Sequence, residues 1–191
     1  MRPPWSFKRT ANFESAICGY SLNPGAYTAI LKGKNNGVGV GLVEVYDVSP
    51  ASDSKLANVS TRGLVFLNSA ENSLIAGTIL SGQGSQQVLV RGIGPSLNLP
   101  FRLGNPLIRL VDANGAVLRE NNDWRDDQEA AISATGLAPT NDQESAILET
   151  LPANGAAYTV ILTDGNPVLP PIGPQPPLLG GAALVEIYRL P

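Results

Sequence analysis

The sequence predicts an all-β protein built as a two-sheet antiparallel β-sandwich with one short helix. Charged residues make up only 15% of the chain, whereas Gly (20) and Pro (16) are abundant. Short runs rich in β-branched residues alternate with these turn formers, and one strand-turn-strand phrase occurs twice. This combination is typical of antiparallel sheets packed face to face. With 191 residues, 43% of them hydrophobic, the chain is long enough to bury a core without crosslinks.

The duplicated phrase has two arms. Residues 26–31 (Ala-Tyr-Thr-Ala-Ile-Leu) return as 157–162 (Ala-Tyr-Thr-Val-Ile-Leu), and residues 41–46 (Gly-Leu-Val-Glu-Val-Tyr) return as 183–188 (Ala-Leu-Val-Glu-Ile-Tyr). A third phrase, Glu-Ser-Ala-Ile, begins at Glu14 and again at Glu144. We therefore expect an irregular leader at 1–13, a partial repeat with its linker at 14–54, and one complete module at 55–191, which is either separate from 14–54 or forms one continuous domain with it.

The partial repeat is expected to form a hairpin. Strands over 27–32 and 39–48 flank a Gly- and Asn-rich turn at 33–37. The loop of the second copy, 164–181, is longer and holds six prolines between Pro167 and Pro177. Proline fixes φ and removes a donor, so this loop is an extended excursion. It is interpreted as a tolerated surface insertion, and the alternative is a loop that lies over a groove or presents a polyproline II face to a partner.

Between the two hairpins we expect further strands and a helix. The turn 112–115, Asp-Ala-Asn-Gly, joins two of the strands. A helix is expected over 123–132, with Asp123 as its N-cap and Gly136 as its stop. The total is about nine or ten strands, and those of the central region are 61–67, 74–80, 86–93, 106–111 and 116–120.

Composition excludes several functions. The net charge is −3 and no basic run occurs, which argues against nucleic acid as a partner. No apolar stretch reaches the length of a membrane span, so membrane insertion is not expected. The chain has no histidine, which excludes Ser-His-Asp catalysis and histidine-ligated zinc. Its one cysteine, Cys18, allows no internal disulfide and is interpreted as a small apolar filler. The first residues do not form a signal peptide.

The acidic stretch at residues 120–129 is the best candidate for a metal-binding or catalytic site. Oxygen-bearing side chains crowd into it, and Ca²⁺ takes six to eight oxygen ligands. The spacing departs from the EF-hand pattern, and a capped helix with a solvated acidic first turn is the favoured interpretation of the stretch, with a calcium site as the alternative. A bound calcium ion would activate water, with Asp126 or Asp127 as general base. The predicted calcium ligands are Glu120, Asn122, Asp123, Asp126 and Asp127.

Trp124 lies inside the acidic stretch. It is interpreted as a core anchor; exposed, it would stack on a sugar ring, with Arg125 beside it as a second ligand-binding residue. Glu44 and Glu186 occupy equivalent positions of the two copies. Strand alternation puts both on an outward polar face, where an arginine on a neighbouring strand is the expected partner.

Several motifs, taken in order, resemble a β-sandwich repeat of large secreted bacterial proteins, frequent in verrucomicrobial and related environmental genomes. They lie at 56–63, 88–97, 121–125 and 134–142, and the strand-turn-strand at 106–120 is similar to the jelly-roll pre-peptidase C-terminal modules of secreted enzymes. The resemblance covers 56–190 as one unit and 14–48 as the tail of another. It implies a jelly-roll-like module and an extracellular location.

Two functions follow as hypotheses. The first is a non-catalytic extracellular module for adhesion, structural assembly or glycan binding, stabilised by calcium. It includes a homo-oligomer formed by strand exchange of the N-terminal hairpin, which would leave open edges on its own. The alternative is a calcium-dependent hydrolase of small esters or lactones.

Overall fold

The computed structural model describes residues 15–17, 21–48, 56–66, 73–166 and 180–191. The chain separates into two compact units, Met1–Ser54 and Lys55–Pro191. The second unit holds every strand and the α-helix of the described residues, and the first holds one turn of 3₁₀ helix. The leader 1–13, Glu14, Cys18 and the proline-rich part of the last loop (167–179) lie outside the described residues.

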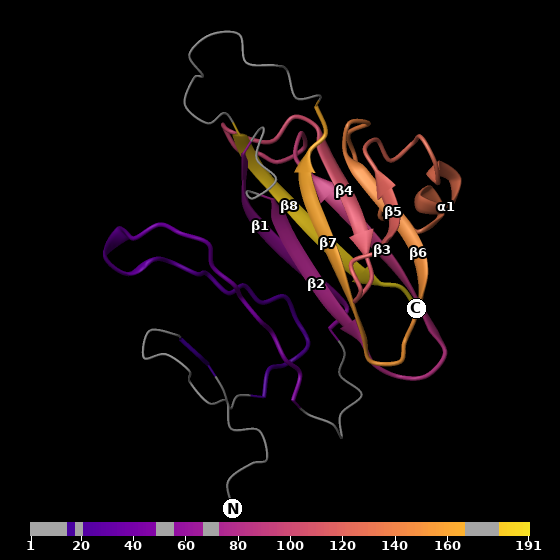
Figure 1. Ribbon diagram of the computed structural model, residues 1–191, viewed down its shortest axis with the longest axis horizontal. Helices are drawn as coiled ribbons and strands as arrows, with labels where there is room; N and C mark the ends of the chain where they lie inside the picture. The colour runs from indigo at the N-terminus through magenta and orange to yellow at the C-terminus, as the bar shows by residue number, and fades with distance from the viewer. Residues whose placement is uncertain (1–14, 18–20, 49–55, 67–72, 167–179) are drawn as a thin grey trace, which may run out of the picture. The chain divides into compact units, whose positions relative to one another are not determined.

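The elements of the second unit follow one another with short connections (Figure 1). Two of the predicted strands have the expected bounds, and the others shift by one to three residues at their ends. The bounds are β1 Asn58–Phe66, β2 Leu74–Leu80, β3 Ser85–Ile93, β4 Pro106–Val111, β5 Val117–Asn121, α1 Glu129–Ala134, β6 Ser145–Pro152, β7 Ala156–Asp164 and β8 Gly180–Arg189.

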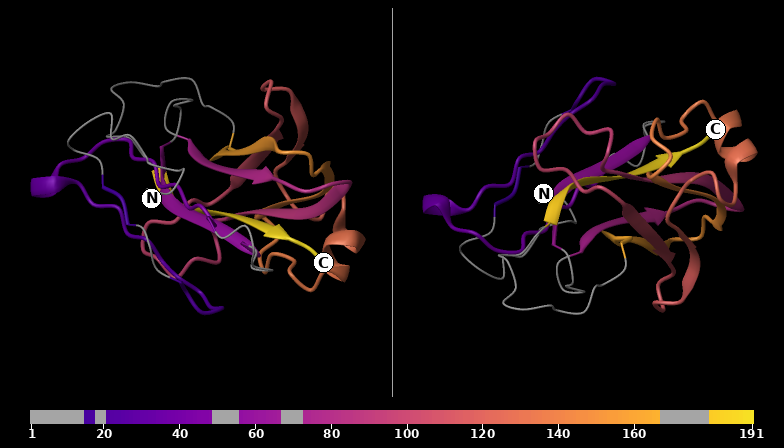
Figure 2. Two further views of the ribbon diagram at one scale, coloured as in Figure 1. Left: turned by 90° about the horizontal axis from the view of Figure 1, so that it is seen from below. Right: turned by 90° about the horizontal axis from the view of Figure 1, so that it is seen from above.

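The eight strands form two four-stranded sheets, which confirms the predicted β-sandwich. One sheet, here called sheet A, has the order β1-β8-β3-β6, and sheet B has the order β2-β7-β4-β5. All pairs are antiparallel: the first strand pairs with the eighth, the second with the seventh, the third with the sixth and the fourth with the fifth. This is one long folded ribbon wound into two layers, the jelly-roll arrangement (Figure 2).

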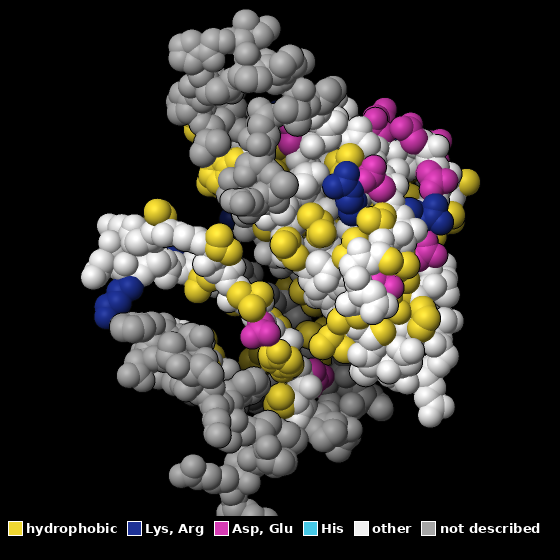
Figure 3. All heavy atoms as spheres, viewed as in Figure 1, with side chains coloured by type: hydrophobic (Ala, Val, Ile, Leu, Met, Phe, Trp, Pro, Cys, Tyr) yellow, Lys and Arg dark blue, Asp and Glu magenta, His cyan; other side chains and the backbone are white. Residues whose placement is uncertain are grey.

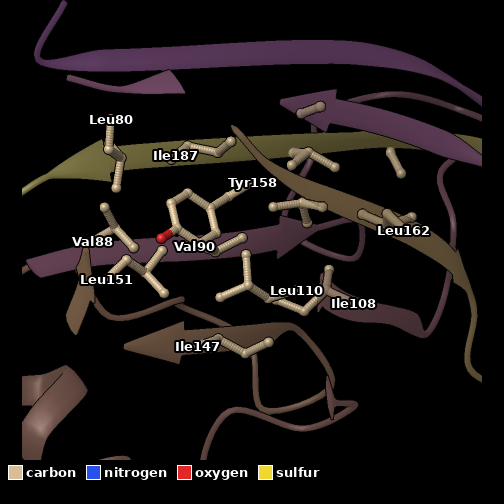
Figure 4. Packing of buried hydrophobic residues seen from close by; sticks show 14 of the residues in the cluster. Leu80, Val88, Val90, Ile108, Leu110, Ile147, Leu151, Tyr158, Leu162 and Ile187 are labelled. Atoms are coloured by element: carbon tan, nitrogen blue, oxygen red, sulfur yellow. The ribbon is translucent and has the colours of Figure 1, made fainter. Parts of the chain in front are cut away.

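The main core lies between the two sheets. Alternate residues of each strand point inward, so β3 contributes Val88 and Val90 while β8 contributes Ile187. The ring of Tyr158 from β7 lies among these side chains (Figure 4). Its hydroxyl donates a hydrogen bond to the carbonyl oxygen of Pro152 at 3.1 Å. The aromatic ring can therefore be buried without leaving its polar end unpaired.

At Gly92 of β3 the neighbouring strands leave no room for a side chain inside this core. A Cβ atom placed on it would lie 2.5 Å from Ser145 Oγ and 2.6 Å from Ile108 Cγ2. Ser145 is its partner on β6, and Ile108 reaches across from sheet B. The absence of a side chain at Gly92 is therefore what lets the two sheets meet here.

A second, smaller core covers the outer face of sheet A. Leu89 and Ala146 point outward from this sheet and pack with Trp124 and Ile132. Ile132 belongs to α1, which lies beside this sheet in the views of Figure 2. The part of sheet A around Leu89 and Ala146 is therefore buried on both faces, whereas the edge strand β1 leaves its outer face to solvent, as strands of an antiparallel sheet commonly do.

The predicted helix start at Asp123 is wrong. The helix begins at Glu129, and residues 122–128 form turns instead. The backbone N–H of Trp124 donates to the carbonyl oxygen of Glu144 at 2.9 Å, and its side chain is 3% exposed. Because Trp124 is held in the second core by these contacts, the backbone does not adopt helical geometry before Glu129. The predicted stop is confirmed, since Gly136 has a φ of +71° just after the helix.

The first unit has the predicted turn but not the predicted strands. Residues 34–36 form the 3₁₀ turn η1 (Lys34–Asn36), with Asn35 and Asn36 in the left-handed region. Residues 27–32 and 39–48 form no strand. Their counterparts β7 and β8 explain this, because those strands lie in different sheets and bond to other strands rather than to each other. The two arms of such a hairpin cannot form a ladder alone.

We expect Gly92→Ala to lower the free energy of unfolding by about 1–3 kcal/mol, since the new methyl group overpacks the space between the sheets. Urea unfolding followed by circular dichroism measures this. Gly104→Ala is the matched control, because a Cβ atom there meets nothing within 4 Å. Equal stability of the two variants would show that Ser145 and Ile108 do not pack as closely against Gly92 as the structure has them.

Candidate functional site

The outer face of sheet A carries a nearly buried ion pair. Arg91 of β3 and Glu186 of β8 stand opposite each other in the strand register. Arg91 Nε donates to Glu186 Oε2 at 2.9 Å, and a second guanidinium nitrogen contacts the same oxygen. The side chains are only 18% and 12% exposed. The predicted arginine partner of Glu186 is thus confirmed, but the position is covered rather than outward in solvent.

Two further groups complete this pair. Arg91 donates to the carbonyl oxygen of Leu137 at 2.8 Å and to the Tyr188 hydroxyl at 3.1 Å. The Tyr188 hydroxyl in turn donates to Glu186 Oε1 at 2.9 Å. Burial, and then this bond to the carboxylate, raise the pKa of Tyr188. Both oxygens of Glu186 therefore have donors, and the Arg91 charge is held in place from three sides.

Glu144 supplies a second carboxylate close by. It immediately precedes β6, and none of its surface is exposed. Its Oε1 accepts the backbone N–H of Gly94 at 3.2 Å and that of Ser96 at 2.9 Å, and the Ser96 hydroxyl donates to it at 2.6 Å. The carboxylate thus fixes the turn that follows β3. Its other oxygen, Oε2, is buried and has no hydrogen-bond partner.

A cavity of about 210 Å³ lies between these two carboxylates on the outer face of sheet A. Pro139 and Thr140, from the segment after α1, help to enclose it. It is smaller than the roughly 300–1,000 Å³ typical of sites for drug-sized ligands, so it suits a single ring or head group. Its lining consists of Arg91, Ile93, Ser96, Pro139, Thr140, Glu144, Leu184 and Glu186.

The cavity is suited to a ligand that donates hydrogen bonds. Glu186 and Arg91 already satisfy each other, so the unsatisfied polar atom is the Oε2 of Glu144. A buried acceptor without a donor costs free energy, about 1–3 kcal/mol or more when charged. A hydroxyl or ammonium group would relieve this cost. An anionic ligand would meet the excess negative charge of the two carboxylates.

A second hollow of about 440 Å³ lies at the β5 and β6 edges of the sandwich. Arg119 and Glu149, which line it, pair at 3.0 Å, and the Tyr158 hydroxyl is already bonded inside it. Asp112 accepts two backbone N–H groups of its own turn, which lowers its pKa. These partnered groups leave this hollow with less to offer a ligand than the Glu144 cavity.

The acidic stretch predicted as a calcium site is largely engaged with arginines. Glu120 pairs with Arg109 across β4 and β5, and Asp127 pairs with Arg119 at 2.6 Å. Figure 3 shows acidic and basic side chains side by side over β4, β5 and α1. Within the described ranges, no three or more acidic or cysteine side chains gather as a group suited to a metal ion.

Asp123 and Asn122 are placed differently from the rest of the stretch. The pKa of Asp123 is raised, first by partial burial and then by the charges of Asp126 and Asp142. Asn122 has a buried Oδ1 without a hydrogen-bond partner, and so has Asn105. Both amide side chains lie against Gly165. The calcium site and the general-base roles of Asp126 and Asp127 stay predictions.

Trp124 is placed as the core anchor that its sequence context favoured. The guanidinium of Arg125 covers its ring at 4.2 Å from the centroid, and Arg125 also pairs with Glu129 and with Asp142. In this arrangement the ring presents no open face for a sugar. Ligand binding by Trp124 and Arg125 stays a prediction that the structure does not test.

Sequence reasoning missed Arg91 and Glu144 as site residues. A signal for Glu144 was present, since it opens the repeated phrase Glu-Ser-Ala-Ile. The structure explains that phrase: Glu144 holds the turn after β3, Ser145 lies opposite Gly92, and Ala146 and Ile147 enter the two cores. The cavity itself combines side chains from β3, β8 and two loops, and no local pattern reveals such a combination.

No model of a known protein family matches the chain, and none of the curated proteins compared with it is similar. The resemblance to the secreted β-sandwich repeat therefore stays a prediction. Among the described residues, no helix is long and apolar enough to cross a membrane.

We expect Arg91→Met to lower the free energy of unfolding by about 3–5 kcal/mol, because it leaves the covered carboxylate of Glu186 without its cation. Arg109→Met is the matched control, since the Arg109–Glu120 pair is nearly half exposed on both sides and should contribute about 1 kcal/mol or less. Urea denaturation of both variants provides the comparison. A loss for Arg91→Met no larger than that of the control would show that the pair is not buried in solution.

Proposed function

We propose that this chain is a non-catalytic β-sandwich module that binds a polyhydroxylated ligand, such as the terminal residue of an extracellular glycan. The observation that carries the proposal is the Oε2 atom of Glu144, a buried carboxylate oxygen without a donor beside a cavity. Such an atom is costly unless a partner arrives. Adhesion and assembly, the wider functions expected of such a module, would use the same recognition.

The lining favours a hydroxylated ring over other small donors. Ile93 and Leu184 offer an apolar floor from sheet A, and Pro139 covers it from above. Ser96 and Thr140 are exposed residues of the lining, and the Ser96 hydroxyl already donates to Glu144 Oε1. A sugar ring has the same division, with carbon-bound hydrogens on its faces and hydroxyls around its edge. One hydroxyl would donate to Glu144 Oε2 while a ring face lies on the apolar residues.

The ion pair supports this role by holding the site rigid. Arg91, Glu186 and Tyr188 are bonded to one another before any ligand arrives. A preformed polar wall reduces the ordering cost of binding. It also keeps Arg91 from closing onto Glu144, which would fill the acceptor that the ligand needs.

We expect Glu144→Gln to weaken binding of the best sugar by roughly 10-fold or more, because a charge-assisted hydrogen bond is lost. Glutamine keeps an oxygen for Gly94 and Ser96, so the turn should hold. Saturation-transfer NMR over a panel of neutral monosaccharides and disaccharides selects the ligand, and calorimetry measures it. Glu120→Gln, on exposed β5, is the control and should bind as the native chain does.

Two outcomes would contradict the proposal. One is that no neutral sugar in the panel binds. The other is that Glu144→Gln binds as tightly as the native chain. If a small ammonium compound binds and no sugar does, the cavity is a binding site but its ligand is not a sugar, which also contradicts the proposal.

Calcium stabilisation of the module is a separate prediction, and Asn122 is the predicted ligand that best fits it. Amide oxygens are calcium ligands, and the buried Oδ1 atoms of Asn122 and Asn105 both lack hydrogen-bond partners. A cation bound to the native state must raise the melting temperature. We expect added calcium to do so in the native chain and not in Asn122→Leu. Asp127→Asn, which removes a partner of Arg119, should keep the response.

If calcium changes the melting temperature of none of these chains relative to equal magnesium, the calcium prediction fails. The sugar proposal is independent of that result, because none of the predicted calcium ligands lines the cavity. A homo-oligomer through the N-terminal hairpin is likewise independent and rests on different residues.

A further inference from the structure

The last hairpin of the sandwich is held by four strands that are not part of it. β7 lies between β2 and β4 in sheet B, and β8 lies between β1 and β3 in sheet A. Although consecutive in the chain, β7 and β8 do not pair with each other. A hairpin of this type can complete its backbone hydrogen bonds only when it inserts between strands equivalent to β1, β2, β3 and β4.

The first unit carries a second copy of this hairpin. Residues 26–31 match 157–162 of β7 at five of six positions, and 41–46 match 183–188 of β8 at four of six. The internal contacts match too. The Tyr46 hydroxyl donates to Glu44 at 2.9 Å, as Tyr188 does to Glu186 at the same distance. Leu31 lies against Gly41, and their counterparts, Leu162 and Ala183, share the main core.

The two copies differ in burial. Tyr27 is 60% exposed where its counterpart Tyr158 is 5% exposed, and Val43 is 49% exposed where Val185 is fully buried. The same holds for Leu31 against Leu162 and for Val45 against Ile187. The first copy therefore presents to solvent the apolar face that the second copy buries between the sheets. Exposed apolar faces of this kind mark interaction sites.

We propose that the hairpin of residues 26–48 inserts into a sandwich unit of the same type that lacks its own last two strands. An intact second copy of the Lys55–Pro191 unit does not fit, because its own β7 and β8 already lie between the receiving strands. Exchange between intact copies would release one hairpin for each one taken up. The receiving unit should carry an arginine where Arg91 stands here, facing Glu44 as Arg91 faces Glu186. This mode of binding adds strands to open sheet edges.

A shortened form of this chain serves as the receiving probe. It ends at Pro152, so it lacks β7 and β8, and it carries Val43→Asp so that its own hairpin cannot fill the gap. Co-expressed with the full chain, the tagged probe should become soluble and co-purify with it. The full chain with Val43→Asp should lose this ability, because an aspartate would replace a fully buried valine. The full chain with Ala26→Asp is the control, since the counterpart of Ala26 in β7, Ala157, is exposed.

A second experiment tests the first copy's sequence inside the folded unit. Only three substitutions, Val160→Ala, Ala183→Gly and Ile187→Val, convert the two core phrases of β7 and β8 into those of the first copy. We expect the triple variant to keep a cooperative unfolding transition at a lower melting temperature. A chain that does not fold would overturn the proposal, since the first-copy phrases could then not form these strands.

Two outcomes of the co-expression experiment would overturn the proposal. Rescue of the probe by Val43→Asp as well as by the native chain would show that β7 and β8, not the hairpin, are being donated, and would overturn the proposal. So would a probe that stays insoluble with every chain. A dimer of the full chain alone that depends on Val43 would replace the proposed partner with a second intact copy.

Discussion

The side chain and backbone of Glu144 tie together three segments that are distant in the sequence. Its carboxylate holds the turn after β3 through Gly94 and Ser96, and its carbonyl oxygen accepts the N–H of Trp124. Trp124 in turn fixes the path of residues 122–128 over sheet A. Without this buried anion, the loops that cover the outer face would have no common anchor. The structure thus depends on a charged group that solvent does not reach, and only one of its two oxygens is used for the purpose.

The loops that Glu144 holds over sheet A also form the cavity of the proposed function. Over β3 and β6, sheet A is covered on its outer face by loops and a six-residue helix, which cannot exclude water as a second sheet would. The polar groups on that face must therefore bond to one another, as Arg91, Glu186 and Tyr188 do. The remaining space is small, preformed and lined by both charged and apolar groups. A covering layer of loops produces a specific cavity where a covering sheet would produce a continuous core.

Most of the fold could be predicted from local sequence, but little of the site could. β2 and β4 have the predicted bounds because turn formers delimit runs of strand-forming residues on both sides. The helix start was misplaced because the tertiary contacts of Trp124 override the capping preference of Asp123. The strands expected at 27–32 and 39–48 failed because their hydrogen-bond partners would have to come from other elements. Glu144 and Arg91 escaped notice because a buried charge is recognised by its partners, and those lie 46 to 97 positions away.

The winding of the ribbon also governs when the sandwich can form. β1 pairs with β8, and β2 pairs with β7. These two edge strands are synthesised first, so they can form their backbone hydrogen bonds only after the last two strands have been synthesised. Pairings between such distant segments close large loops, and topologies dominated by them fold in milliseconds to seconds rather than microseconds. During that interval the unpaired strands of the nascent chain are open to other partners. The order of synthesis therefore makes the final hairpin the step that closes both sheets at once.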